Sequence, residues 1–184
     1  MLKKFVLGGM TALVLAACGG EGGSASSSAP AQSANASGSL IERINNKGTI
    51  TVGTEGTYAP FTYHDKDGKL TGYDVEVTRA VADKLGVKVE FKETQWDSMM
   101  AGLKAGRFDV VANQVGLTSP ERQATFDKSE PYSWSGAVLV ARKDSNIKSI
   151  DDIKGVKTAQ SLTSNYGEKA KAAGAELVPV DGLA

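Results

Sequence analysis

The 184-residue chain has a single cysteine, Cys18, and a single histidine, His64. One cysteine excludes an internal disulfide, so packing of the core must stabilise the fold. The usual multi-histidine and cysteine zinc sites are excluded too, and we expect neither a metal nor a cofactor. His64 is interpreted as a solvated turn residue. Lys plus Arg and Asp plus Glu both number 21, so the sequence gives no indication of a nucleic-acid partner or an anionic lipid surface.

A long apolar run occurs at the N-terminus, where residues 5–16 follow Lys3 and Lys4. The run is too short to span a bilayer and is typical of a secretory signal. Its end, Leu15-Ala16-Ala17-Cys18, resembles the lipobox of bacterial lipoproteins. This resemblance implies removal of residues 1–17 and acylation of Cys18, for example by palmitate. The alternative is an ordinary signal peptide followed by a chance cysteine.

The segment after Cys18 is composed almost entirely of Gly, Ser and Ala up to residue 39. Such a composition cannot bury enough apolar surface to offset its conformational entropy, so residues 18–39 are predicted to form a flexible tether. A lipid on Cys18 would then hold the protein on a membrane in the cell envelope, in the periplasm or on the cell surface. We expect the folded part to start near Leu40.

Alternation of apolar and polar residues predicts a first strand, Thr49–Gly53, followed by a turn-rich segment over residues 54–67. Asp74 is the expected N-cap of a helix that ends before Gly86 and has its apolar face at Val77, Ala80, Val81 and Leu85. A strand over residues 87–91, a helix over 97–105 and a buried strand over 109–112 complete the first lobe, residues 40–133. Strands separated by helices indicate a mainly parallel α/β sheet.

A second α/β lobe is expected over residues 134–184. Strands are predicted at 137–141, 156–160 and 177–180, and a capped helix at 164–173. Residues 148–155 are interpreted as a short helical connection.

Two polar segments follow strands of the first lobe: residues 55–61 after the first strand and residues 113–122 after the third. In parallel sheets, ligands bind beyond the carboxyl ends of the strands. We therefore expect these two segments to converge on a binding site.

Several ordered motifs then resemble the polar amino acid binding proteins of ABC importers (solute-binding protein family 3). They are Gly53-Thr54-Glu55-Gly56-Thr57-Tyr58-Ala59-Pro60-Phe61, Leu70 to Glu76, Trp96 to Met100, Gly106 to Val111, Thr118 to Arg122, and Phe126 to Tyr132. The resemblance implies a type II periplasmic-binding-protein fold, with two α/β lobes joined by a hinge. Asn113-Gln114-Val115 and Thr163-Ser164-Asn165-Tyr166 most resemble the cystine-binding branch.

Family members continue well past residue 184, so the second lobe is expected to be incomplete in this chain. The acidic residue that usually binds the ligand ammonium lies in that later part of the family sequence. The segment Gly116 to Pro120 is also one residue longer than the common pattern.

The resemblance assigns Arg122 to the ligand α-carboxylate, which a guanidinium holds with two parallel hydrogen bonds. A surface arginine is the alternative. Tyr58 and Phe61 are expected to stack against an apolar or disulfide-containing ligand side chain, with core packing as the alternative for Phe61. Trp96 is expected to form a wall of the same pocket or else to pack its helix onto the sheet.

Asn113, Gln114, Gly116 and Thr118 offer amide, backbone and hydroxyl groups to the ligand, with turn formation as the alternative. Thr163, Ser164 and Asn165 precede a helix whose free N–H groups favour a carboxylate, with simple capping as the alternative.

The main functional hypothesis is a lipid-anchored, non-enzymatic binding protein that captures a free amino acid, with cystine preferred, and delivers it to a membrane permease. A second hypothesis is an exported dehydratase-like enzyme with a carboxylate such as Glu55 as acid or base. A third is a sensor or surface-interaction lipoprotein with reduced ligand binding.

Overall fold

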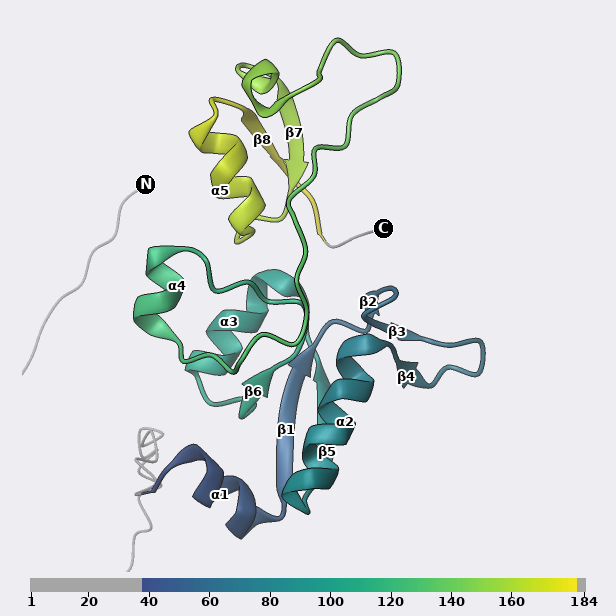
Figure 1. Cartoon of the computed structure of the whole chain (residues 1–184), viewed down its shortest axis with the longest axis vertical. Helices are drawn as coiled ribbons and strands as arrows, with labels where there is room; N and C mark the ends of the chain where they lie inside the picture. Colours follow the sequence, from purple (N-terminus) through teal and green to yellow (C-terminus); the bar gives the residue numbers. More distant parts are fainter. Residues whose placement is uncertain (1–37, 182–184) are drawn as a thin grey trace, which may run out of the picture. The chain divides into compact units, whose positions relative to one another are not determined.

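A three-stranded parallel sheet organises the first half of the computed structural model, which describes residues 38–181. Its strands lie in the order β5 (Lys88–Glu93), β1 (Thr49–Thr54) and β6 (Val110–Val111) (Figure 1). The predicted strands and their parallel pairing are confirmed, with Ile50 opposite Val89 and Val52 opposite Val110. β6 is shorter than expected.

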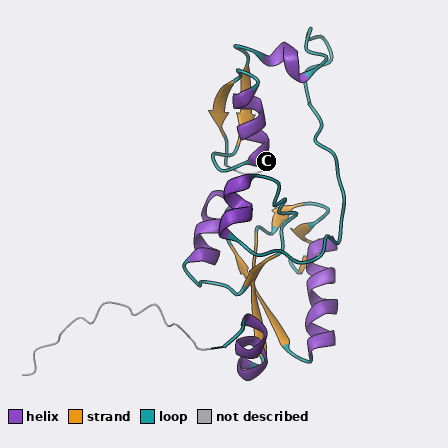
Figure 2. Cartoon of the chain, turned by 60° about the vertical axis from the view of Figure 1, so that its left-hand side comes forward, coloured by secondary structure: helices purple, strands orange, loops and turns teal. Residues whose placement is uncertain are grey.

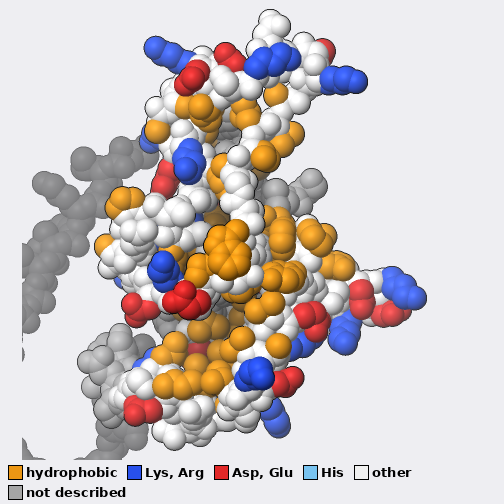
Figure 3. All heavy atoms as spheres, in the orientation of Figure 1, with side chains coloured by type: hydrophobic (Ala, Val, Ile, Leu, Met, Phe, Trp, Pro, Cys, Tyr) orange, Lys and Arg blue, Asp and Glu red, His pale blue; other side chains and the backbone are white. Residues whose placement is uncertain are grey.

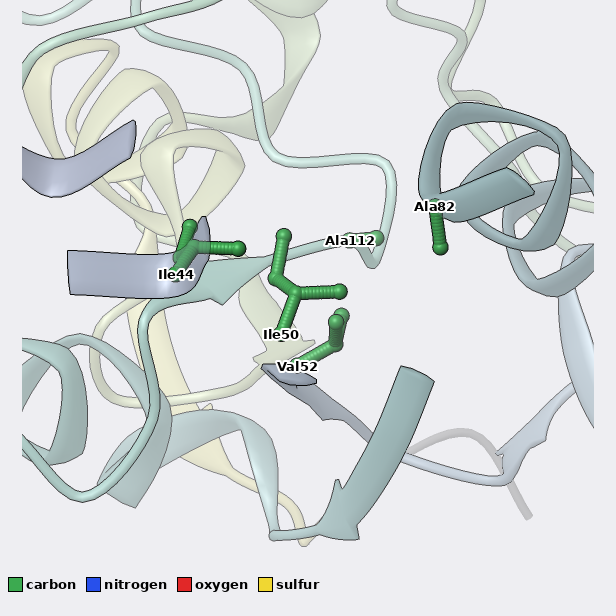
Figure 4. Close-up of a cluster of buried hydrophobic side chains, with 5 residues drawn as sticks. All are labelled: Ile44, Ile50, Val52, Ala82 and Ala112. Atoms are coloured by element: carbon green, nitrogen blue, oxygen red, sulfur yellow. The ribbon is translucent and has the colours of Figure 1, made fainter. Parts of the chain in front are cut away.

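Alternation along β1 sends its side chains to opposite faces of the sheet. Ile50 and Val52 pack in one cluster with Ile44, Ala82 and Ala112 (Figure 4). Ile44 belongs to α1 (Leu40–Lys47) and Ala82 to α2 (Tyr73–Leu85), so both helices cover this face.

The other face of β1 packs against α3 (Trp96–Lys104) through Phe108. A Cβ atom on Gly53 or on Gly102 of α3 would lie 2.7 Å from the Phe108 ring. The ring therefore occupies the space that two missing side chains leave between the strand and the helix.

The start of the folded part agrees with the prediction. Ser39 is the N-cap of α1, and it forms a capping box with Glu42. Cys18, the signal segment and nearly all of the predicted tether lie outside the described residues.

The predicted start of α2 is wrong, and so is the predicted apolar face except at Val77, which is half-buried. Gly72 occupies the N-cap position, and Asp74 lies inside the first turn with 1% of its surface exposed. Val81 and Leu85 are exposed, as is Ala80, whereas Val75, Thr78 and Ala82 are buried. The buried face includes polar residues because the Thr78 hydroxyl donates to the Asp74 carbonyl and the Asp74 carboxylate bonds to Gln114.

The turn-rich segment also contains short strands. β2 (Thr57–Tyr58), β3 (Thr62–His64) and β4 (Leu70–Thr71) form an antiparallel sheet. His64 is therefore a strand residue, not a turn residue, although it is exposed. Its ring nitrogens lie 3.2 Å from the Gly56 carbonyl oxygen and 3.1 Å from a Glu93 carboxylate oxygen.

After α4 (Pro120–Thr125), a long stretch of loop leads to the 3-10 helix η1 (Ile150–Ile153), as Figure 2 shows. Next come β7 (Lys157–Gln160), α5 (Asn165–Ala172) and β8 (Glu176–Pro179), with β7 and β8 parallel. The predicted connection, helix and last two strands are confirmed. Described residues of both halves belong to one compact unit, and the division into two lobes at residue 133 stays a prediction.

The predicted strand at 137–141 is wrong. This segment is loop, with Val138 85% and Val140 88% exposed. The segment lines a cavity of about 1000 Å³ together with residues of β7. Among the described strands, however, β7 pairs with β8 and not with this segment. Without a ladder of hydrogen bonds the apolar segment does not become a strand. Other hydrophobic side chains are also visible at the surface drawn in Figure 3.

Asp109, next to β6, supports a testable stability prediction. Its carboxylate accepts hydrogen bonds from the Thr51 N–H (2.8 Å), the Thr51 hydroxyl (2.6 Å) and Lys47 Nζ (3.2 Å). Burial tends to raise the pKa of Asp109, but these bonds outweigh it and lower the pKa below the ordinary 3.8.

Asp109→Asn should therefore lower the free energy of unfolding at pH 7 by about 1–2 kcal/mol. Because a lowered folded-state pKa stabilises above the unfolded value, the difference should shrink as pH falls below 3.8. Urea unfolding of both variants between pH 7 and pH 3 measures it, and a constant difference would contradict the assignment.

Candidate functional site

A cavity of about 640 Å³ lies beyond the carboxyl ends of the parallel strands. Glu55 follows β1, Trp96 begins α3 shortly after β5, and Asn113 follows β6, and all three line the cavity. The predicted convergence of segments 55–61 and 113–122 is confirmed by direct bonds between Glu55 and Asn113. The volume falls in the range of small-molecule sites.

The lining combines aromatic rings with a few charges. Glu55 is the one carboxylate among the described lining residues, and Lys128 and Lys169 are the cations. The aromatic residues are Tyr58, Trp96, Tyr132, Trp134 and Tyr166. This surface suits a small ligand that carries both charge signs on a body able to contact aromatic rings.

Asn113 is 1% exposed, and both its amide oxygen and its amide nitrogen are hydrogen-bonded. Its Oδ1 accepts from the Glu55 N–H at 2.9 Å and the Thr54 hydroxyl at 3.3 Å, while Nδ2 donates to Glu55 Oε2 at 2.7 Å. Asn113 thus fixes both the backbone and the carboxylate of Glu55, and leaves the other carboxylate oxygen available to a ligand.

The predicted site residues divide into two groups. Phe61, Arg122 and Thr163 do not line the cavity. Phe61 packs edge-on against the ring of Tyr58, with 5.1 Å between ring centroids. The residues that the cavity brings together are Tyr58, Trp96, Asn113, Gln114, Gly116, Thr118, Ser164 and Asn165.

Arg122 is buried directly behind the cavity wall, with 8% of its surface exposed. Its Nη1 donates to the Gly116 carbonyl at 3.0 Å and its Nη2 to the Thr163 carbonyl at 2.7 Å. The guanidinium also lies 5.5 Å from the centroid of the Trp96 ring. It is therefore no ordinary surface arginine. In this structure Arg122 binds the backbone carbonyls of Gly116 and Thr163. Its role in binding the α-carboxylate of a ligand stays a prediction.

The turn before α5 is held by Asp97. Its carboxylate accepts from the Leu162 N–H (3.3 Å), the Thr163 N–H (3.0 Å) and the Thr163 hydroxyl (2.7 Å). Ser164 caps the helix by accepting from the N–H groups of Tyr166 and Gly167. Capping, the alternative considered from sequence, is thus present at Ser164.

The aromatic wall also has perturbed acid–base properties. Burial raises the pKa of Tyr58, and the nearby Tyr166, Asp74 and Glu55 raise it further. Burial likewise raises the pKa of Tyr132, and the nearby Asp74 raises it further. Both phenols therefore remain neutral at physiological pH and can donate or accept hydrogen bonds. The buried Trp96 Nε1 has no partner within residues 38–181, so a bound acceptor could take this hydrogen bond.

Sequence reasoning missed several residues of the site. From sequence, Glu55 belongs to the converging segment 55–61 but has an individual role only as a possible enzymatic acid or base, and Asp74 is expected only as a helix cap. Tyr132, Trp134 and Tyr166 line the cavity although they lie far from Glu55 along the chain. The available signal was an aromatic side chain in a polar stretch, because Trp134 stands between Ser133 and Ser135.

Across the described part of the chain, no group of three or more His, Cys, Asp and Glu residues could hold a metal ion. None of the helices there is long and apolar enough to cross a membrane.

Comparison with known proteins identifies the family. Residues 50–177 match the model of the bacterial extracellular solute-binding proteins, family 3. The chain belongs to this family. The fold class predicted from the motifs, a type II periplasmic-binding-protein fold, is confirmed, because solved structures of amino acid-binding proteins have the same fold.

Curated members of the family are close in sequence. A probable amino-acid ABC transporter-binding protein of Haemophilus influenzae is 61% identical, covering 80% of this chain and 57% of the relative. An L-cystine-binding protein of Bacillus subtilis is also 61% identical, covering 80% of this chain and 55% of the relative. The chain thus spans little more than half the length of these curated relatives.

Solved members of the family are similar as well. The L-cystine solute receptor of Neisseria gonorrhoeae, in its unliganded open conformation, is 96% identical with a TM-score of 0.52, covering 79% of this chain and 62% of that one. An ancestral amino acid-binding protein described as a precursor of cyclohexadienyl dehydratase is 37% identical with a TM-score of 0.70, covering 77% of this chain and 65% of that one.

Proposed function

We propose that this chain is part of an extracytoplasmic receptor for L-cystine that serves an ABC importer. The observation that carries the proposal is the cavity beyond β1, β5 and β6, which combines one carboxylate, two lysines and five aromatic rings. The name of the 96% identical receptor supports cystine as the ligand. The partners would be the free amino acid and the membrane subunits of the permease.

The chemistry of cystine fits this lining. Cystine carries two ammonium groups, two carboxylates and a disulfide between them. Glu55 would accept from an ammonium group, and Lys128, Lys169 or Arg122 would bind a carboxylate. The aromatic rings would contact the polarisable sulfur atoms, as they do those of other sulfur-containing side chains.

Capture and delivery of an amino acid require no covalent bond to be made or broken. We therefore propose that the receptor is not an enzyme. A ligand can contact residues from both halves of the chain, such as Glu55 and Asn165. Such contacts would favour a closed conformation, in which the two lobes approach each other around the ligand. A lipid on Cys18 would keep the receptor at the membrane surface, close to the permease.

Calorimetric titration tests the proposal. The chain, and the chain joined to the C-terminal remainder of the Haemophilus influenzae relative, are titrated with L-cystine, cysteine, glutamine, histidine and arginine. We expect a preference for cystine of at least about tenfold in affinity in the extended form. Absence of cystine binding in both forms contradicts the proposal, and recovery of a chemically altered ligand would favour the dehydratase-like alternative.

Glu55→Gln separates charge from shape at the site. Glutamine keeps an oxygen that accepts from Asn113 Nδ2, so the fold should be preserved. Loss of the charge should weaken cystine binding by about tenfold or more, because a charge-assisted bond contributes about 1.5–3 kcal/mol. Glu121→Gln, on the exposed surface of α4, is the control and should bind like the parent chain. Equal affinity of both variants would remove Glu55 from the site.

A further inference from the structure

A buried carboxylate lies behind the binding cavity without an ion-pair partner among residues 38–181. Asp74, in the first turn of α2, is 1% exposed. It accepts from the Gln114 backbone N–H at 2.7 Å and from Gln114 Nε2 at 2.5 Å. Burial raises the pKa of Asp74, which shows that the carboxylate is held there against a desolvation cost.

Gln114 has an unusual backbone for its residue type. Its φ of +51° is in the left-handed region, and it is the one non-glycine residue with positive φ in the described chain. Left-handed backbone costs an ordinary side chain of order 1 kcal/mol and persists only where neighbours enforce it. The two bonds from Asp74 supply that constraint, and the Ser133 hydroxyl adds a third by donating to Gln114 Oε1 at 3.0 Å.

The conformation of Gln114 sets the direction of the binding segment. Asn113, Val115 and Gly116 on either side of it all line the cavity. Asn113 fixes Glu55, and the Gly116 carbonyl accepts from Arg122. A change of the backbone at residue 114 would therefore move groups on both sides of the proposed ligand.

We propose that Asp74 is a positioning residue of the binding site, which acts through Gln114 to hold residues 113–116 in the conformation that meets the ligand. The expected effect of Asp74 on ligand affinity rests on the proposed function as a cystine receptor. Asp74 would not touch the ligand itself, since it does not line the cavity. Its position in the first turn of a 13-residue helix helps to stabilise its charge.

The test uses exchange of hydrogen-bonding roles. Asp74→Asn retains one acceptor oxygen but presents an NH₂ group to the NH₂ group of Gln114, so one bond is lost. Adding Gln114→Glu to this variant restores the lost hydrogen bond with donor and acceptor exchanged. The side-chain amide at position 74 then donates to the carboxylate at position 114. The Ser133 hydroxyl can still donate to that carboxylate. Asp83→Asn, on the exposed side of α2, is the matched control.

Two readouts are measured in the full chain and in its extended form. Asp74→Asn should weaken L-cystine binding by about tenfold or more and accelerate amide hydrogen exchange at Gln114 by about tenfold. Exchange at Val52, in the core strand, should change much less. The double variant should recover much of both losses, and Asp83→Asn should behave like the parent.

The outcomes distinguish the inference from the function on which it rests. Unchanged exchange at Gln114 in Asp74→Asn overturns the positioning role, as does equal acceleration at Gln114 and Val52, which would indicate general destabilisation. A double variant that recovers neither readout also overturns it. If the parent binds no cystine, the proposed function fails, while the exchange data still decide whether Asp74 holds the segment.

Discussion

Replacing Arg122 by methionine should have the largest effect on the binding site. The guanidinium is buried, and it donates to the carbonyl groups of Gly116 and Thr163. Methionine fills much of the volume but leaves both carbonyls without this donor and removes the cation from beside Trp96. Gly116 is half-buried and Thr163 is exposed, so water can replace part of the lost bonding, and the free energy of unfolding should fall by about 1–3 kcal/mol.

Cystine affinity should fall further than stability alone explains. If Arg122 also binds a ligand carboxylate, the loss should reach about a hundredfold, measured by calorimetry at a temperature where the variant is folded. Arg142→Met is the control, because that side chain is 88% exposed and its nearest carboxylate, on Asp144, is 3.7 Å away. A variant at Arg122 with parental stability and affinity would refute both roles.

Replacing Gly72 by alanine should have the largest effect on the fold. Gly72 has a φ of +119°, and an added Cβ would overlap the Phe61 carbonyl group and lie 2.9 Å from the Pro60 carbonyl oxygen. These same carbonyls accept from the first N–H groups of α2, those of Tyr73 and Asp74. The substitution therefore separates the helix from the segment that carries Tyr58.

We expect Gly72→Ala to destabilise the chain by about 3 kcal/mol or more, through a disfavoured backbone conformation combined with steric overlap. Gly68→Ala is a matched control, because Gly68 also has positive φ, +76°, but nothing lies within 4 Å of its added Cβ. It should cost only about 1 kcal/mol. Chemical denaturation of the three proteins measures both values, and equal losses at Gly68 and Gly72 would exclude the steric contribution.

The extent to which sequence predicted this fold depends on how local the signals were. The strand over residues 49–53 is predicted correctly because alternation is a local pattern, although residues on both faces of β1 are buried. Ser164 was recognised as a cap because it satisfies N–H groups only two and three residues ahead. Residues 137–141 have equally apolar character, but a strand also needs a partner, and pairing cannot be inferred from composition.

The site shows the same limit. Family motifs pointed to Trp96, Asn113 and Gln114, all of which line the cavity. Asp74 was misinterpreted because its carboxylate bonds to a residue 40 positions away and not to its own helix. Helical spacing predicted the buried face at Val77, Ala80, Val81 and Leu85, and the bonds between Asp74 and Gln114 help to explain why a more polar face is buried.

A crystal structure of the extended protein with L-cystine shows whether the cavity beyond β1, β5 and β6 binds this ligand. We expect the ligand between Glu55 and the aromatic wall, with an ammonium group within hydrogen-bonding distance of the Glu55 carboxylate and the disulfide against Tyr58 or Trp96. Cystine bound elsewhere, or a cavity that remains empty while the protein is saturated with cystine, would contradict it.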